Sequence, residues 1–334
     1  MIKASVVMPV FNGDKYLPYS IESILNQTFR DFECIIIDDG STDNSKTILK
    51  KYNDPRIHLV ENEKNMGLVH SLNRGIDAAK GEYIIRMDQD DISLPNRFAE
   101  QIAFMEKHAD VAVCGSWYKT IGELSGHTNK LLTDSEEIKA NLLFNASLAH
   151  PSVMIRRSVL EQHSLRYRKE NEYFEDYGLW TEISHIAKLA NIPKILLLYR
   201  VHKENISHRY SDKQRNGALH IQKKGLHILG LSPSPEEMRL NNSIRPKEKE
   251  TATVFIKKED RCLRKIIDAN AVKKIYNDTA LAKIIYLRWK AICGNNTKNG
   301  LAVWKQFVLS PIFQMKPYQL LDGIKIFIKC LIGK

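Results

Sequence analysis

Short runs of consecutive apolar residues alternate with amphipathic stretches through the first 90 residues of the chain. The apolar runs have the length of buried strands, and the stretches between them repeat apolar residues at helical spacing. Strands are predicted at residues 4–10, 32–37, 57–60 and 82–87, and helices at about residues 17–29, 43–52 and 69–79. Strands alternating with helices of this length form a parallel sheet through right-handed crossovers. The pattern therefore predicts an α/β fold.

The stretch from residue 95 to residue 210 mixes the two patterns, so the sheet is expected to continue as a mixed one. Helices are predicted at Arg97–Lys107, Ser135–Phe144 and Tyr177–Leu189, and strands at Val111–Gly115, Ser152–Ile155 and Ile195–Tyr199. Ser232–Pro235 and the charged run Arg245–Glu250 have the composition of a linker. We expect a main domain at residues 1–210, a helix and linker at 211–250, and a tail at 251–334.

The tail contains two basic amphipathic helices. One apolar face is formed by Leu281, Ile284, Ile285, Trp289 and Ile292, and the other by Leu320, Leu321, Ile324, Phe327, Ile328 and Leu331. Four aromatic side chains are expected to be exposed, namely Trp289, Trp304, Phe307 and Phe313. Two interpretations stay open: helices lying in a membrane interface, or a small helical subdomain packed on the main one.

Net charge separates the tail from the rest of the chain. Of the 334 residues, 50 are Lys or Arg and 39 are Asp or Glu; residues 251–334 hold 16 and 5 of these. The other 250 residues therefore have no net charge, with 34 charges of each sign. A basic tail can bind nucleic acid or an anionic membrane surface. It has no recognisable nucleic-acid motif, so we expect no nucleic-acid partner and keep the membrane surface as a partner.

The cysteine content and the first residues indicate the cytoplasm. The five cysteines are scattered and have no CxxC or Cys/His spacing, which argues against disulfides and against a zinc site. Met1–Ala4 leads directly into a strand without the pattern of a signal peptide. No stretch approaches the roughly 20 apolar residues of a membrane-spanning helix.

Three carboxylates, those of Asp88, Asp90 and Asp91, follow the apolar run Tyr83–Ile85 directly. Like charges packed this closely resist ionising together unless a cation neutralises them. Divalent cations prefer such oxygen ligands, and α/β sheets bind ligands at the carboxyl ends of their strands. The cluster therefore predicts a metal that holds phosphates; an acidic solvated loop is the alternative.

Two other predicted strands end at the same edge, in Pro9–Gly13 and Asp38–Ser41. The chain lacks the G-x-G-x-x-G loop of dinucleotide sites and the G-x-x-x-x-G-K-[ST] loop of nucleoside triphosphatases. A carboxylate such as that of Asp39 can accept hydrogen bonds from a base or ribose. A nucleoside diphosphate across the edge, with the metal on its phosphates, fits these features.

Several motifs together carry a family resemblance. They are Ser5–Gly13, Asp38–Asp43, Asn65–Gly67, Gly81–Ile84 and Asp88–Asp91. In their order along the chain they resemble inverting family 2 glycosyltransferases with the GT-A fold, over about residues 4–210. The resemblance implies a nucleotide-binding half at 1–92, an acceptor half at 93–210 and a basic helical extension after them.

The resemblance also implies roles for single residues. The residues implied to bind the nucleotide are Pro9, Val10, Phe11, Asn12, Asp39, Asn65, Asp88 and Gln89. The residues implied to bind the metal, Mn²⁺ or Mg²⁺, are Asp90 and Asp88, with Asp91 as an alternative to Asp90. Leu72–Gly75 has Leu where many members have a nucleotide-binding Arg. That contact is either absent here or supplied by Arg74 or Arg86.

Catalysis with inversion needs a carboxylate that takes the proton of the acceptor hydroxyl. Phe174–Trp180 resembles the family's Glu-Asp motif, which implies that Asp176 is the base and that Glu175 supports it. An acid in the first turn of a helix is also favoured by the helix dipole alone. His202 falls where related enzymes place a late His or basic residue against the metal or diphosphate, which adds His202 to the predicted metal residues. For His150 we favour a structural role.

The resemblance predicts an enzyme that transfers a hexosyl or N-acetylhexosaminyl group from a nucleotide-sugar donor, with a UDP-sugar favoured. The acceptor would be a glycan or a lipid-linked glycan of cell-surface polysaccharide synthesis. We expect a cytoplasmic enzyme, peripheral on the inner face of the plasma membrane through residues 251–334. The alternatives are a non-catalytic nucleotide-sugar-binding module and a basic nucleic-acid-binding protein.

Overall fold

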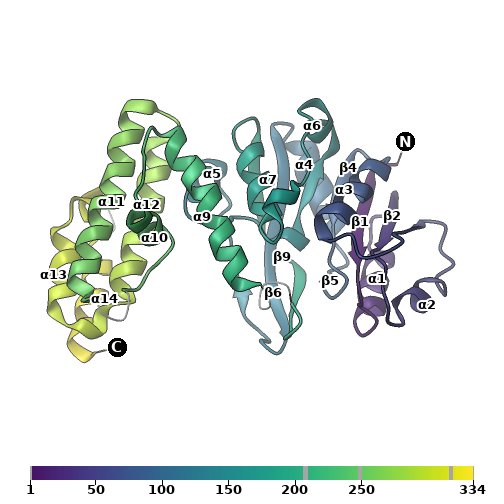
Figure 1. The fold of residues 1–334 in the computed structure, drawn as a ribbon, viewed down its shortest axis with the longest axis horizontal. Helices are drawn as coiled ribbons and strands as arrows, with labels where there is room; N and C mark the ends of the chain where they lie inside the picture. Colours follow the sequence, from purple (N-terminus) through teal and green to yellow (C-terminus); the bar gives the residue numbers. More distant parts are fainter. Residues whose placement is uncertain (1, 206–209, 247–249, 316–318, 334) are drawn as a thin grey trace. The chain divides into compact units, whose positions relative to one another are not determined.

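The structure, a computed structural model, describes residues 2–205, 210–246, 250–315 and 319–333. Its internal contacts divide the chain into a sheet unit, Met1–Ile138 with Ala146–Gly217, and a helical unit, Lys139–Asn145 with Ala218–Lys334. Two helices, α5 (Ser135–Asn141) and α9 (Ser211–Ile228), continue from one unit into the other (Figure 1). The units therefore divide near residue 217, whereas the sequence pattern places boundaries near residues 210 and 250.

The sheet unit is built on one mixed sheet with nine strands among the described residues, in the order β3-β2-β1-β4-β8-β6-β9-β5, with β7 paired to β6. The first part contains β1 (Ala4–Val10), α1 (Leu17–Leu25), β2 (Phe32–Asp38), α2 (Ser45–Leu49), β3 (Ile57–Glu61), α3 (Leu68–Ala78) and β4 (Tyr83–Arg86). The second part contains β5 (Ile92–Ser93), α4 (Arg97–Lys107), β6 (Val111–Gly122), β7 (Thr128–Asn129), β8 (Met154–Arg156), α6 (Arg157–Gln162), α7 (Glu175–Ile183) and β9 (Lys188–Val201). Strands β3, β2, β1 and β4 are parallel, and β8 pairs antiparallel with β4. The predicted α/β sheet is confirmed.

The central strands are apolar throughout because both of their faces are covered. Every residue of β1 and β2 is buried, as expected for inner parallel strands. On one side α3 comes so close to β1 that a Cβ atom on Gly75 would lie 2.4 Å from Cγ1 of Val7. Only glycine allows this close approach of helix and strand.

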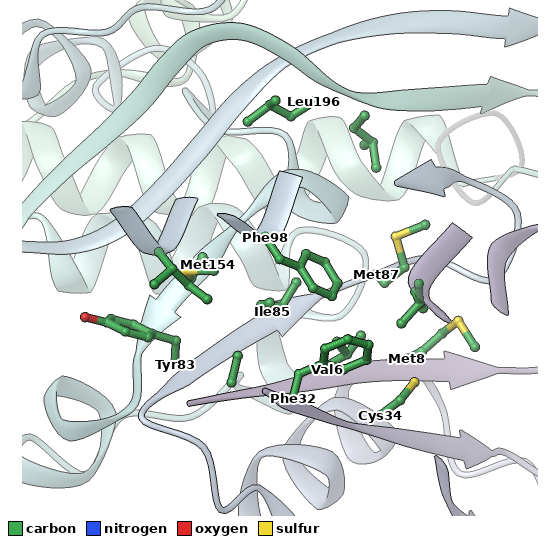
Figure 2. Close-up of a cluster of buried hydrophobic side chains, with 14 of the residues drawn as sticks. Val6, Met8, Phe32, Cys34, Tyr83, Ile85, Met87, Phe98, Met154 and Leu196 are labelled. Atoms are coloured by element: carbon green, nitrogen blue, oxygen red, sulfur yellow. The ribbon is translucent and has the colours of Figure 1, made fainter. Parts of the chain in front are cut away.

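A continuous core lies between the parallel strands and α4 (Figure 2). The rings of Phe32 and Phe98 meet edge to face with their centroids 5.3 Å apart, beside Val6 and Ile85. Met87, the last residue before the acidic cluster, is fully buried in the same core. The core thus fixes the strand end from which the three carboxylates project.

The helix predicted at Tyr177–Leu189 is wrong in its second half. The helix α7 ends at Ile183, and β9 begins at Lys188, where it pairs with Val111 of β6. Ile186, which a longer helix would have to bury, is exposed. Pairing with a distant strand overrides the local pattern here, because the register between β6 and β9 extends to Val201.

The helical unit contains α10 (Pro235–Asn241), α11 (Ala252–Lys273), α12 (Asp278–Gly294), α13 (Leu301–Leu309) and α14 (Gln319–Ile332) (Figure 1). The segment Ser232–Pro235, predicted as linker, begins α10: the Ser234 hydroxyl accepts the backbone N–H of Glu237 in a capping box. Part of the other predicted linker, residues 247–249, lies outside the described residues.

The expectation of exposed tail aromatics is wrong for Trp289 and Phe307, which are 1% and 0% exposed. They stack on each other with ring centroids 6.4 Å apart, and the apolar face predicted for α12 is buried with them. Trp304 and Phe313 are half-buried. This part of the tail is therefore the core of a helical unit. Across the described ranges, no helix has the length and apolar character needed to cross a membrane.

Candidate active site

The ends of β1, β2 and β4 meet at one edge of the sheet, as predicted. Val10 pairs with Asp38 in the parallel register, and the Asp39 N–H donates to the Val10 carbonyl at 2.7 Å. The N–H of Met87 donates to the carbonyl of Val7 at 3.2 Å. Loops 11–14, 39–43 and 88–91 therefore start side by side.

The acidic cluster is compact. One carboxylate oxygen each from Asp88, Asp90 and Asp91 lies within 4.8 Å of the others. Burial, together with the charges of Asp90 and Asp88, raises the pKa of Asp91 well above its usual range. Its Oδ2 is buried and has no hydrogen-bond partner among the described residues, whereas its Oδ1 accepts the N–H of Arg200 at 2.7 Å. The cluster thus brings three carboxylates together, and one buried oxygen of Asp91 has no partner among the described residues.

Residues near the end of β9 hold Asp90. His202 Nε2 lies 2.8 Å from Oδ2 of Asp90, and the Arg200 guanidinium donates to the Asp90 carbonyl at 2.7 Å. The backbone N–H of Glu204 donates to Nδ1 of His202 at 3.3 Å, which leaves Nε2 to donate to Asp90. His202 thus lies beside the cluster as a hydrogen-bond partner of Asp90, and its role as a metal ligand stays a prediction. Sequence analysis missed Arg200 and Asn205, whose amide lies 3.3 Å from the same Asp90 oxygen.

Arg86 lies buried at the end of β4 and pairs with the carboxylate of Asp88. Its backbone carbonyl accepts a hydrogen bond at 2.9 Å from Arg97, a fully buried residue of α4. Burial lowers the pKa of Arg97 to about 9. Two buried guanidinium groups thus lie next to the acidic cluster. The sequence analysis named Arg86 as a candidate and missed Arg97.

Asp39 clamps the loop before α3. Its Oδ1 accepts the N–H of Met66 and its Oδ2 that of Gly67, both at 2.9 Å. The Asn62 amide donates to Oδ1 at 2.6 Å, and the Asn65 side chain accepts the N–H of Gly67 at 3.1 Å within the same loop. Asp39 is therefore at the predicted edge, where it also fixes a loop.

The loop after β1 is held by side chains predicted to bind nucleotide. The side-chain oxygen of Gln89 accepts the backbone N–H of Phe11 at 2.8 Å, and its amide nitrogen donates to the Phe11 carbonyl at 3.1 Å. Asn12, at a φ of 49°, accepts the N–H of Thr42 at 2.8 Å. The Phe11 ring is 40% exposed at this edge, whereas Pro9 and Val10 are buried in β1.

Of the two arginines left open for a nucleotide contact, Arg74 points to the end of β3. It donates to the carbonyl of Glu61 at 2.7 Å and to the side chain of Asn62. Arg86 alone of the two lies at the acidic cluster.

Glu175 and Asp176 begin α7, and their surroundings differ. Glu175 is buried; burial and the charge of Asp176 raise its pKa to about 8, and its Oε2 has no partner among the described residues. Asp176 is half-buried and accepts the N–H of Tyr177 at 2.7 Å. Burial raises the pKa of Asp176 too, against the effect of that N–H. Asp176 is thus the carboxylate that solvent reaches.

Behind Glu175 lies a buried polar pair that the sequence did not indicate. Nε2 of His150 is 2.8 Å from the hydroxyl of Tyr167, and its Nδ1 is 3.7 Å from Glu175. Burial, with the charge of Arg86, holds the pKa of His150 well below its usual range, so this histidine is neutral. It supports the start of α7, as expected of a structural histidine.

The acidic cluster and the start of α7 act on each other electrostatically. The charge of Arg86 lowers the pKa of both Glu175 and Asp176, and the charge of Asp88 raises both. The carboxylates that begin α7 are thus sensitive to the charges of Arg86 and Asp88 at the end of β4.

Comparison with known proteins identifies the family of this chain. Residues 5–164 match the model of glycosyl transferase family 2. An uncharacterized glycosyltransferase of Haemophilus influenzae is 32% identical over 234 residues, covering 66% of this chain and 72% of that protein. The O-antigen biosynthesis glycosyltransferase WbnJ of Escherichia coli is 36% identical over 212 residues, 60% of this chain and 80% of that protein.

Two solved structures share the fold at low identity. TarS 1-349 of S. aureus, in complex with UDP-GlcNAc, has a TM-score of 0.58 at 15% identity, over 99% of this chain and 92% of that one. The mannosyltransferase PcManGT from Pyrobaculum calidifontis, in complex with GDP-Man and Mn2+, has a TM-score of 0.55 at 14% identity, over 99% and 88%. With the family model and the relatives, they show that this chain belongs to glycosyltransferase family 2 and is a glycosyltransferase with the GT-A fold.

Proposed function

We propose that this glycosyltransferase transfers a sugar from a nucleoside diphosphate donor, with a UDP-sugar favoured, to a hydroxyl group, with inversion at the anomeric carbon. The observation that carries the proposal is the compact group of carboxylates from Asp88, Asp90 and Asp91 at the edge where β1, β2 and β4 end. A diphosphate would be held there, and the acceptor would be held at Asp176, whose pKa is affected by the charges of Arg86 and Asp88.

The donor would lie across the edge formed by β1, β2 and β4. We assign the nucleoside to the exposed ring of Phe11 and to the loops held by Asn12, Asp39, Asn65 and Gln89, over a floor of Pro9 and Val10. The complexes of TarS with UDP-GlcNAc and of PcManGT with GDP-Man support a nucleotide sugar as donor. Arg86 supplies the positive charge nearest the diphosphate.

The three aspartates suit a divalent cation, Mn²⁺ or Mg²⁺. Their oxygens are close together, and the buried Oδ2 of Asp91 has no partner among the described residues, which is the donor set that a hard cation prefers. Asp90 and Asp88 would hold the ion, with Asp91 as a third ligand, and His202 would orient Asp90. Such an ion neutralises charge on the departing nucleoside diphosphate as a Lewis acid.

Asp176 is the proposed general base. As the acceptor oxygen forms its bond to the anomeric carbon, the bond from that carbon to the diphosphate breaks and the hydroxyl proton passes to Asp176. The raised pKa of Asp176 makes it a better proton acceptor. Glu175, with its pKa of about 8, stays protonated at neutral pH and can donate a hydrogen bond from behind.

The acceptor is proposed to be a glycan or a lipid-linked glycan of cell-surface polysaccharide synthesis, acting at the inner face of the plasma membrane. The O-antigen role printed for WbnJ supports this class of acceptor. The non-catalytic alternative is disfavoured because Asp88, Asp90 and Asp176 are all present.

A panel of nucleotide sugars, read by thermal shift with and without Mn²⁺, tests the donor. We expect one nucleotide to stabilise the protein only with the metal, and Asp90→Asn to abolish that stabilisation while the unliganded protein melts as before. Equal affinity for UDP, GDP and dTDP in Mn²⁺ and in EDTA would contradict the proposal. Asp77→Asn, at an exposed carboxylate of α3, is the matched control.

A further inference from the structure

The last described helix of the chain, α14, is apolar on two faces. Six aliphatic side chains on its outer face are between 46% and 77% exposed: Leu320, Leu321, Ile324, Ile328, Leu331 and Ile332. They recur at the spacing of one helical surface. Exposed apolar residues are common singly, but a continuous row of them marks an interaction surface.

The opposite face of α14 is already used. Ile326 and Cys330 are buried, and the ring of Phe327 meets that of Trp304 with centroids 5.0 Å apart. Asp322 accepts the hydroxyl of Tyr286 at 2.8 Å and pairs with Lys290 at 2.7 Å. The helix therefore packs within its unit through this face. The exposed aliphatic row lies on a separate face that does not contribute to the core.

Positive charge accompanies the outer row. Lys325 and Lys329 are exposed on α14 and form no ion pair within the described part of the chain. With Lys290 they rim a groove of about 580 Å³ between α12 and α14, whose apolar wall includes Leu287 and Ile328. None of the described residues that line this groove is acidic. The surface therefore combines an aliphatic row with lysines and suits an apolar, anionic partner.

We propose that the outer face of α14 binds the surface of an anionic phospholipid bilayer. The aliphatic row enters the boundary between headgroups and acyl chains, and Lys325 and Lys329 contact lipid phosphates. With 14 residues, α14 is about 21 Å long, too short for a hydrocarbon core of roughly 30 Å, so it lies in the plane of the membrane. This function is separate from the proposed sugar transfer and does not depend on it.

Vesicle flotation of the full chain tests the proposal. At low salt, the protein should float with vesicles of phosphatidylcholine and phosphatidylglycerol, and less with phosphatidylcholine alone. Ile324→Glu/Ile328→Glu should weaken binding by roughly tenfold or more. Lys325→Gln/Lys329→Gln should reduce the preference for anionic vesicles by about fivefold per charge.

The matched control is Val272→Glu/Leu309→Glu. Both residues are exposed in the helical unit, on α11 and α13, so this variant carries the same change of charge outside the aliphatic row of α14. It should bind vesicles several-fold more tightly than Ile324→Glu/Ile328→Glu. All variants should keep the melting temperature and nucleotide response of the parent protein, which separates membrane binding from donor binding.

Two results would overturn the proposal. One is a parent protein that does not float with anionic vesicles at low salt. The other is equal loss of binding in the α14 variant and in its control, which would assign binding to net charge alone. Light scattering provides a further test: a dimer that Ile324→Glu/Ile328→Glu converts to monomer, without vesicle binding by either, would show that a second copy covers the face.

Discussion

The Nε2 atom of His202 lies 2.8 Å from Oδ2 of Asp90, across 112 positions of the sequence. The ring of Tyr16, between α1 and the loop after β1, lies beside the same imidazole at a centroid distance of 5.2 Å. The end of β9 is thereby tied to the acidic cluster. The orientation of Asp90 depends on this bond.

For this reason His202→Gln should weaken metal binding without unfolding the protein. Loss of a group that orients a metal ligand costs about 10–100-fold in metal affinity. Titration of Mn²⁺ in the presence of a saturating nucleoside diphosphate measures the change. His127→Gln, at an exposed imidazole, should leave it unaltered; a His202→Gln protein with parental Mn²⁺ affinity would remove His202 from the site.

Asp176→Asn and Glu175→Gln separate the two carboxylates of α7. If Asp176 is the base, Asp176→Asn should slow transfer by roughly 10²–10⁴-fold with donor affinity retained. Glu175→Gln keeps the hydrogen-bond donor that a protonated carboxyl provides, so its transfer rate should fall much less. Single-turnover rates with the donor found in the panel give both values. The reverse order of effects would assign the base to Glu175.

Glu259 should make the stability of the helical unit depend on pH. It lies 1% exposed on α11, neither of its oxygens has a hydrogen-bond partner in the described residues, and burial raises its pKa to about 8. Because this pKa exceeds the usual 4.5, the folded state holds its proton more tightly than the unfolded state does. The resulting stability is complete below the usual pKa and is lost as the pH rises through about 8.

We therefore expect Glu259→Gln to stabilise the protein by about 1–3 kcal/mol at alkaline pH and to flatten the pH profile. Urea unfolding at about pH 5 and about pH 9 measures the effect. Asp268→Asn, at an exposed carboxylate of the same helix, should leave the profile unchanged. A profile equally steep in Glu259→Gln would assign the dependence to other groups.

Gly75→Ala tests the contact between α3 and β1. The added methyl would lie 2.4 Å from Val7 Cγ1 and 2.8 Å from Ile37 Cδ1, so strand or helix must shift. We expect a loss of about 1–3 kcal/mol in the free energy of unfolding. At Gly294, the same methyl meets no atom within 4 Å, so Gly294→Ala should be neutral or slightly stabilising. Equal melting temperatures for the two variants would show that α3 can move away from β1.

The parallel half of the sheet could be predicted because its strands are buried on both faces. Continuous apolar runs such as Ala4–Val10 indicate parallel strands that are covered on both faces. The polar residues that follow these strands then lie at one edge of the sheet. The acidic cluster and Phe11 were found in this way. Here, local pattern and tertiary structure agree.

The rest depends on contacts between distant positions, which local patterns do not encode. Residues 184–189 have apolar positions that suit a helix or a strand, and pairing of β9 with β6 decides between them. Trp289 is buried where Phe307 stacks on it, and Arg97 is buried where it donates a hydrogen bond to the carbonyl of Arg86. None of these partners lies within one helical turn of the residue it fixes.

Strand β4 joins the two halves of the sheet through few residues. Four of its residues pair in parallel with β1, and three pair antiparallel with β8. The strands on the two sides of β4 run in opposite directions. Arg86 is the last residue of β4, at the edge where donor and acceptor chemistry would meet. Residues on the β8 side can therefore change without altering the register on the β1 side. On the proposed assignment of donor and acceptor sides, such a seam would let the acceptor side vary while the donor side stays unchanged.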